Sequence, residues 1–289
     1  AIAFKNSGLG TPIIVAKEHV VIERFKEIGY GGNLDIRIVN STNKEMRDKY
    51  VKLLFKKMHR DQGLLERDCD RMVRTDRVIW ASCMVECGDA DAMVTGNTRR
   101  YSQSLEKIKK VIPARLGEIM FGLNMVVSKG KTVFIGDTSV NEYPTSEELA
   151  DIAISSARVV RLFGFDPKVA FLSHSTFGQP ITSRTKHIRD AVEILKKRKV
   201  DFKFDGDMQP DVALSEEYSD LYPFSEIVGK ANILIMPGQH SAAISNKIMK
   251  TLGGAKIVGP LLIGLAQPIE IAPLRSSTSE ILDLASVAA

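Results

Sequence analysis

Residues 134–180 read as a strand, a helix and a second strand joined in one crossover. After the first apolar run, a polar loop leads to Thr145, whose hydroxyl can cap a helix, with Glu148 at the capping-box spacing. Apolar side chains then recur at helical spacing until Gly164, a residue that favours a helix end. Residues 169–172 form a short apolar run, as in a strand covered on both faces. The stretch therefore predicts a parallel crossover, with both strand ends at one edge of a sheet.

Predicted strands and helices alternate along the rest of the chain, and this order is typical of an α/β fold with mainly parallel sheets. The 289 residues suffice for two modest domains or one large one, and an apolar fraction of 44% supports a packed core. In such sheets, ligands bind at the carboxyl ends of the strands. The polar loops that follow the predicted strands are therefore the first candidates for a site.

Composition argues against several classes of function. Lys and Arg number 40 against 35 Asp and Glu, and no basic run has interleaved aromatic residues, so we expect no specific nucleic-acid binding. No apolar run approaches membrane-spanning length. The 3 cysteines and the lack of a signal peptide favour a reducing, cytoplasmic environment. Cys83 and Cys87 lack further ligands nearby, so we interpret them as buried thiols and predict no metal site.

Four loops carry polar residues with more than one interpretation. Residues 95–100 lead from a strand into a helix, and could either cradle an anion with Arg99 and Arg100 or form a solvated turn. Neighbouring side chains on a strand point to opposite faces, so residues 173–176 fit hydrogen-bond donors to a ligand better than a Ser-His-acid triad. Residues 237–241 fit a helix capped by Ser241 better than an anion cradle.

The fourth loop comprises residues 205–211, which follow a strand predicted at residues 201–204. Asp205, Asp207 and Asp211 could approach a divalent ion, but a calcium loop needs more oxygen ligands and a final glutamate. We therefore interpret this segment as a turn with solvated carboxylates.

Motifs spread over nearly the whole chain resemble one known family. They are Gly88-Asp89-Ala90-Asp91 before Val94-Thr95-Gly96, Asp137 with Val140-Asn141, Glu147-Glu148-Leu149-Ala150, Ser175-Thr176, Asp205-Gly206 with Gln209 and Asp211, and Leu252-Gly253-Gly254-Ala255 before Gly259-Pro260. Together they resemble the motifs of the phosphotransacetylase family of acyl-CoA:phosphate acyltransferases.

The resemblance implies two α/β/α sandwich domains with an interdomain cleft. The first would comprise residues 1–122 with 262–289, without the family's opening strand, and the second residues 123–261. Acetyl-CoA or coenzyme A would bind in the cleft, and the chain would form at least a homodimer. The ligand-binding residues implied are Gly96, Asn97, Thr98, Arg99, Arg100, Asn141, Ser175, Thr176, Arg275 and Ser276.

Departures from the family pattern bear on activity. The Ser-Arg pair of the family's enzymes falls here on Pro273-Leu274, with Arg275 one residue late. Glu106 and Thr138 stand where many members have arginine and cysteine. A cation that stabilises a developing oxyanion contributes ~2.7–4 kcal/mol to lowering a barrier. Its loss predicts a fold that retains coenzyme contacts without transfer chemistry, and hence no catalytic residues.

The same pattern is similar to the C-terminal domain of the large bacterial NADP-dependent malic enzymes. This implies an acetyl-CoA-sensing, oligomerising domain attached in cis to an N-terminal malic enzyme part, which would hold the NADP and divalent-metal sites. Since the chain begins at Ala1, we expect a piece of a longer protein. Two alternatives stay open: an active phosphate acetyltransferase using Arg99, Arg100 or Arg275, and a pure assembly module.

Overall fold

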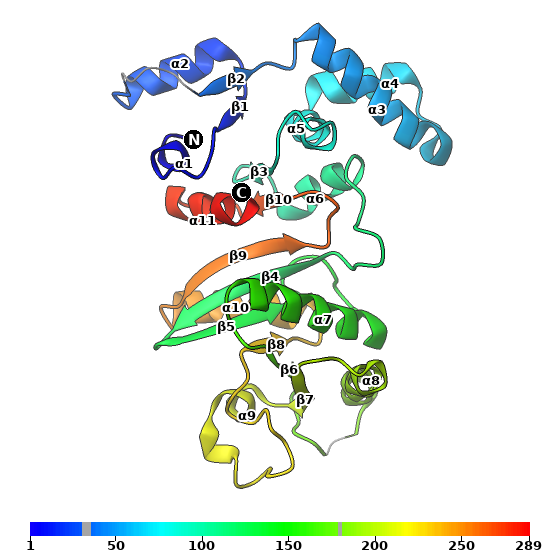
Figure 1. Ribbon diagram of the computed structural model, residues 1–289, viewed down its shortest axis with the longest axis vertical. Coiled ribbons are helices and arrows are strands. Elements are labelled where there is room, and N and C mark those ends of the chain that lie inside the picture. The colour runs from blue at the N-terminus through cyan, green and yellow to red at the C-terminus, as the bar shows by residue number, and fades with distance from the viewer. Residues whose placement is uncertain (31–35, 179–180) are drawn as a thin grey trace. The chain divides into compact units, whose positions relative to one another are not determined.

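The computed structural model describes residues 1–30, 36–178 and 181–289, and the chain forms two compact units (Figure 1). Unit 1 comprises residues 1–114 and 265–289, and unit 2 comprises residues 115–264. The helices are α1 (Ile2–Asn6), α2 (Glu18–Glu27), α3 (Lys44–Gln62), α4 (Glu66–Thr75), α5 (Arg77–Glu86), α6 (Tyr101–Lys109), α7 (Ser146–Leu162), α8 (Ser183–Arg198), α9 (Pro210–Leu214), α10 (Gln239–Thr251) and α11 (Thr278–Ala288), with a 3₁₀ turn at Glu216–Tyr218. The strands are β1 (Ile13–Val15), β2 (Arg37–Val39), β3 (Met93–Gly96), β4 (Phe121–Ser128), β5 (Lys131–Gly136), β6 (Lys168–Leu172), β7 (Lys203–Met208), β8 (Ile233–Ile235), β9 (Lys256–Ile263) and β10 (Ile269–Ala272).

Unit 2 contains a sheet with the strand order β7-β6-β8-β5-β4-β9. The pairings from β7 to β5 are parallel, whereas β4 runs antiparallel to both β5 and β9. In unit 1, β1 pairs with β2 and β3 pairs with β10, both in parallel. The predicted α/β class with mainly parallel sheets is confirmed.

The crossover predicted over residues 134–180 is present as β5-α7-β6. Thr145 accepts a hydrogen bond from the Glu148 N–H at 3.1 Å, and its own N–H donates to the Glu148 carboxylate at 2.7 Å. This capping box satisfies two N–H groups that have no partner within the helix. Because the cap needs only local chemistry, the sequence located the start of α7.

Alternating residues of the central strands in unit 2 face two different layers. Phe134 packs its ring against Phe163 at the end of α7, with centroids 5.7 Å apart. Ile135, the next residue, belongs to a buried cluster with Leu234 of β8 and Ala242 of α10. Helices α7 and α10 therefore cover opposite faces of the sheet. Strand β8 lies beside β5 in the sheet. The chain leaves β5 toward the face that α7 covers and leaves β8 toward the face that α10 covers, so the connections after these neighbouring strands run to opposite faces.

Three local expectations were wrong. Strand β7 continues through Asp205 and Asp207 to Met208, where we had expected a turn. Helix α10 begins at Gln239 with Gly238 as its cap, and the Ser241 hydroxyl instead donates to the Gly238 carbonyl at 2.9 Å. Strand β10 was not foreseen, because a buried four-residue strand containing Glu270 has too short an apolar pattern.

Candidate functional site

In unit 1, the loops that follow β3 and β10 lie together. Gly96 is the register partner of Ala272, so the two parallel strands end side by side. The Asn97 N–H donates to the Ala272 carbonyl at 3.0 Å, and the Arg275 N–H donates to the Asn97 carbonyl at 3.2 Å. Residues 96–100 and 275–276, both predicted as ligand contacts, are therefore brought to one place by the strand ends.

This junction requires unusual backbone conformations. Gly96 has a φ of +107°, and a Cβ there would lie 2.2 Å from the Ala272 carbonyl oxygen. Asn97 and Arg275 adopt φ values of 64° and 62°, a backbone region that residues other than Gly, Asn and Asp seldom occupy. The Asn97 Oδ1 atom is buried and has no hydrogen-bond partner among the described residues. Strained backbone persists where the surroundings fix it, and it concentrates at ligand sites.

Arg99 and Arg100 have different roles in the structure. Arg99 Nη1 lies 3.2 Å from both carboxylate oxygens of Asp76, and Lys107 pairs with the same carboxylate. Asp76 also caps α5, accepting the Val78 N–H at 2.9 Å. Arg99 is thus held by a structural ion pair, whereas the side chain of Arg100 is exposed at the start of α6. Of the two arginines, Arg100 is the one available to an anion.

The Asp76 network also sets the protonation of that carboxyl. Burial raises its pKa, but the hydrogen bonds from Lys107 and Val78 and the charges of Lys107 and Arg99 outweigh burial and lower the pKa below the ordinary value. Asp76 therefore stays ionised at neutral pH and holds both cations.

In unit 2, Asp137 organises the loop after β5. Its buried carboxylate accepts the N–H groups of Gly122 at 2.8 Å, Ser139 at 2.9 Å, Val140 at 3.1 Å and Asn141 at 2.6 Å. Burial raises the pKa of Asp137, although these hydrogen bonds oppose the shift. The carboxylate therefore fixes the shape of the segment that carries Asn141.

The side chain of Asn141 is itself part of this scaffold. Its Nδ2 donates to the Met120 carbonyl at 2.8 Å and to Asp137 Oδ2 at 2.7 Å. An amide nitrogen has only two hydrogens, so both are used, and only the Oδ1 acceptor remains for a ligand. Asn141 was predicted as a ligand contact, and this geometry limits that contact to accepting a hydrogen bond.

Ser175 and Thr176 both form hydrogen bonds to residues at the end of β7. Ser175 contacts a buried ion pair between Asp207 and Arg189, which the sequence did not reveal. The Ser175 hydroxyl donates to Asp207 Oδ2 at 2.5 Å, and Arg189 Nε donates to Asp207 Oδ1 at 2.8 Å. Asp207 is fully buried, so Arg189 supplies the charge that makes this burial possible. The Thr176 hydroxyl accepts the Gln209 N–H at 3.0 Å.

The geometry does not support the alternative of a Ser-His-acid triad, because the hydroxyl of Ser175 donates to the Asp207 carboxylate and not to a histidine. The connection between Asp207 and Arg189 has no local sequence signal, since the two residues are 18 positions apart in the chain.

The loops after β5 and β8 also meet at this edge. The Gln239 N–H donates to the Asn141 carbonyl at 3.3 Å, and Gly238 lies so close to the Glu142 carbonyl that a Cβ would be 2.6 Å from its oxygen. Strands β5, β6 and β8 are parallel, and their connections leave toward opposite faces, as α7 and α10 show. Such a switch point is where open α/β sheets form ligand crevices. Asn141, Ser175 and Thr176 thus share one sheet edge in unit 2, and their placement beside residue 96 in a cleft stays a prediction.

Within residues 1–30, 36–178 and 181–289, no group of three or more His, Cys, Asp and Glu side chains could hold a metal ion. The same part of the chain has no helix with the length and apolar character that crossing a membrane requires. Cys69 and Cys83 are buried free thiols and Cys87 is half-buried. Burial raises the pKa of the Cys83 thiol, which makes it a poor nucleophile.

Comparison with known proteins relates the chain to two groups. A NADP-dependent malic enzyme from Rhizobium meliloti (strain 1021) is 42% identical over 292 residues, which covers 100% of this chain but 38% of that protein. A phosphate acetyltransferase from Clostridium acetobutylicum is 30% identical over 295 residues, covering 98% of this chain and 86% of that enzyme. The chain thus spans well under half the length of the malic enzyme and most of the acetyltransferase.

The fold agrees with these relatives. The crystal structure of a phosphotransacetylase from Streptococcus pyogenes superposes with a TM-score of 0.88 and 28% identity, covering 100% of this chain and 89% of that one. The family described as phosphate acetyl/butaryl transferase matches residues 1–289. The resemblance drawn from the motifs is confirmed, and the chain belongs to the phosphate acetyl/butaryl transferase family.

Proposed function

We propose that this chain is the phosphotransacetylase-like regulatory part of a NADP-dependent malic enzyme, and that it binds acetyl-CoA without transferring the acetyl group. The parent protein would oxidatively decarboxylate malate to pyruvate, with NADP and a divalent metal held in its N-terminal part. Acetyl-CoA would act as an allosteric effector, and the chain would assemble as a cytoplasmic homodimer or higher oligomer. The 42% identity to a malic enzyme over the whole chain supports this assignment.

One structural observation carries the proposal. The backbone junction of β3 and β10 is intact, with Gly96 packed against Ala272, yet Pro273-Leu274 stand where the resemblance places the Ser-Arg pair of the active enzymes. A coenzyme phosphate can still meet backbone N–H groups and Arg100 at the start of α6. The cation that would stabilise an oxyanion is displaced, and this loss favours binding over catalysis.

The alternative is an active phosphate acetyltransferase. Arg275 favours it, because its left-handed backbone and its hydrogen bond to Asn97 place an exposed cation one residue beyond the expected position. Under this alternative, Arg275 would take the role of the missing arginine.

Calorimetric titration of the chain with acetyl-CoA tests the binding claim. We expect saturable binding that is weakened at least tenfold in Arg100→Ala, since a hydrogen bond to a charged group is worth about 1.5–3 kcal/mol and ~1.4 kcal/mol is one decade. Lys109→Ala, on the same helix α6, serves as the control. Absence of binding to the unchanged chain would contradict the proposal.

A further inference from the structure

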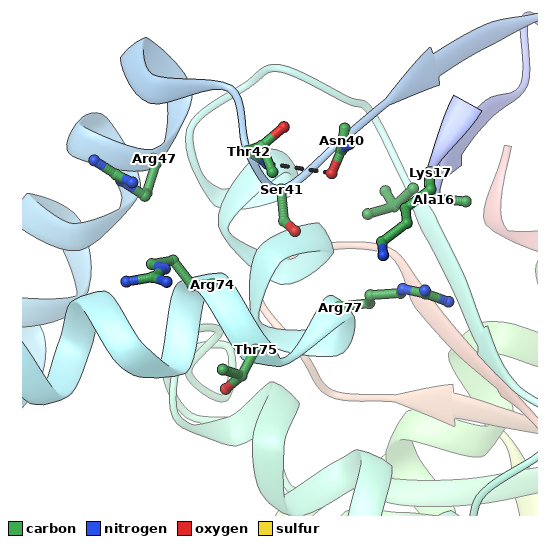
Figure 2. Close-up of a pocket in the computed structure, with 10 residues that line it drawn as sticks. Ala16, Lys17, Asn40, Ser41, Thr42, Arg47, Arg74, Thr75 and Arg77 are labelled. Atoms are coloured by element: carbon green, nitrogen blue, oxygen red, sulfur yellow. Dashed lines mark hydrogen bonds between the residues drawn. The ribbon is translucent and has the colours of Figure 1, made fainter. Parts of the chain in front are cut away.

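A pocket lies within unit 1, and none of its lining residues belongs to the β3–β10 junction (Figure 2). Its volume is about 430 Å³, within the range of small-molecule sites. The lining residues are Val15, Ala16, Lys17, Asn40, Ser41, Thr42, Arg47, Arg74, Thr75 and Arg77. Four cationic side chains from separate segments of the chain thus line this pocket: Lys17, Arg47, Arg74 and Arg77.

The fold explains why these segments converge. Strands β1 and β2 are parallel neighbours, so Lys17 and residues 40–42 follow their carboxyl ends at one edge. Arg74 lies near the end of α4 and Arg77 begins α5. In Figure 2 the side chain of Arg77 lies beneath Lys17, whereas the side chain of Arg74 points toward Arg47. The carboxyl edge of parallel strands is the usual ligand edge of an α/β sheet.

The acidic residues nearby are committed elsewhere or shared. Asp70 lies 3.5 Å from Arg47 Nε and 3.6 Å from Arg74 Nη1, so one carboxylate serves two guanidinium groups through long contacts. The buried Arg47 Nε makes no hydrogen bond within the described part of the chain. Asp76, the neighbour of Arg77, is occupied by Arg99, Lys107 and the Val78 N–H.

Positive charge therefore remains in excess in the pocket. Over the described ranges, no carboxylate forms an ion pair with Lys17 or Arg77. Like charges that converge in this way repel one another unless an anion joins them. The hydroxyls of Ser41 and Thr42 add neutral donors, while the hydroxyl of Thr75 already donates to the Arg71 carbonyl at 2.8 Å.

We propose that this pocket binds a small phosphorylated metabolite, with its phosphate between Lys17 and Arg77. Guanidinium groups match the geometry of phosphate oxygens, and Lys17 adds a point charge. The pocket is larger than one phosphate group, and Val15 and Ala16 offer an apolar wall to the organic part of the ligand. This site is separate from the proposed coenzyme contacts at residues 96–100, and its ligand is a second one.

Calorimetric titration of the chain with inorganic pyrophosphate, at constant ionic strength, tests the site. We expect saturable binding that Lys17→Ala and Arg77→Ala each weaken about tenfold or more, because each removes a charge-assisted contact. Arg71→Ala is the matched control: Arg71 lies on α4 outside the pocket and pairs only loosely with Asp68, at 3.9 Å. Circular dichroism confirms that all three variants fold.

Two results would overturn this assignment. One is pyrophosphate binding that is absent, or equally strong in the wild type, Lys17→Ala and Arg77→Ala. The other is loss of acetyl-CoA affinity in Arg77→Ala, because the pocket would then belong to the coenzyme. If the unchanged chain binds pyrophosphate but not acetyl-CoA, the proposed function fails and the second site stands.

Discussion

Removing Arg189 should destabilise unit 2, because this arginine is the partner of a fully buried carboxylate. Asp207 has 1% of its side chain exposed, and Arg189 Nε donates to it at 2.8 Å. In Arg189→Ala, the Asp207 carboxylate would keep the hydrogen bond from the Ser175 hydroxyl but lose its only ion pair within the described residues. A buried charge left unpaired is costly.

The magnitude follows from the burial of the two groups. Breaking a buried ion pair from one side costs about 3–5 kcal/mol. The side chain of Arg189 is 32% exposed, so water screens part of the interaction, and Ser175 compensates another part. We therefore expect a loss of about 2–4 kcal/mol in the free energy of unfolding. Asp207→Asn added to Arg189→Ala should recover part of this loss, because the amide carries no charge.

Urea unfolding followed by far-ultraviolet circular dichroism measures the effect. The single tryptophan, Trp80, lies in unit 1, so its fluorescence separates unit 1 from unit 2. Lys186→Ala is the control, since Lys186 lies on the same helix in an exposed pair with Asp190, worth at most about 0.5 kcal/mol. Arg189→Ala with the stability of Lys186→Ala would refute the reasoning.

Three further predictions concern unit 1. In thermal unfolding, Gly96→Ala should lower the free energy of unfolding by at least about 2 kcal/mol, because the new Cβ would clash with Ala272 and the backbone is left-handed. Gly88→Ala, with open space around it, should lower it by only about 1 kcal/mol, and equal losses in the two variants would contradict the close packing at Gly96. Asp76→Asn should make stability depend less on pH at the acid end. The pKa of Asp76 is lowered in the folded state, so its contribution to stability is present above the unfolded pKa of about 3.9 and is lost as pH falls through the folded pKa. A urea midpoint whose dependence on pH below about pH 5 is unchanged in this variant would contradict the prediction. Arg99→Ala should lower the melting temperature more than Arg100→Ala in differential scanning calorimetry, because Arg99 is the one of these two arginines that pairs with Asp76. Equal shifts would argue against that ion pair.

Expectations that rested on local chemistry matched the structure best. Thr145 and Glu148 form a capping box that depends on four consecutive residues, so its pattern is visible in the sequence. Residues 128–131, which include Gly130, connect the antiparallel strands β4 and β5 in a hairpin, and a glycine in a tight turn is likewise a local signal. The resemblance to one family, carried by motifs such as residues 88–91, also proved sound.

Expectations that depended on distant partners were the ones that failed or stayed incomplete. Asp207 was expected in a solvated turn, because nothing near it in sequence indicates that Arg189 neutralises it inside the fold. Asn141 was expected to face a ligand, but most of its hydrogen-bonding capacity serves Asp137 and Met120. Arg99 was predicted together with Arg100 as a phosphate contact; the structure shows that Arg99 pairs with Asp76, and its contact with a phosphate stays a prediction. Long-range pairing of charges is not periodic, so sequence patterns do not reveal it.

The central claim is that this chain binds acetyl-CoA but does not transfer acetyl groups. Incubation of the purified chain with acetyl phosphate and coenzyme A, followed at the thioester absorbance, tests it most directly. We expect no rise in thioester absorbance above that of the reaction without protein. Turnover that scales with the amount of chain, and that Arg275→Ala abolishes, would contradict this proposal and establish the chain as an active phosphate acetyltransferase.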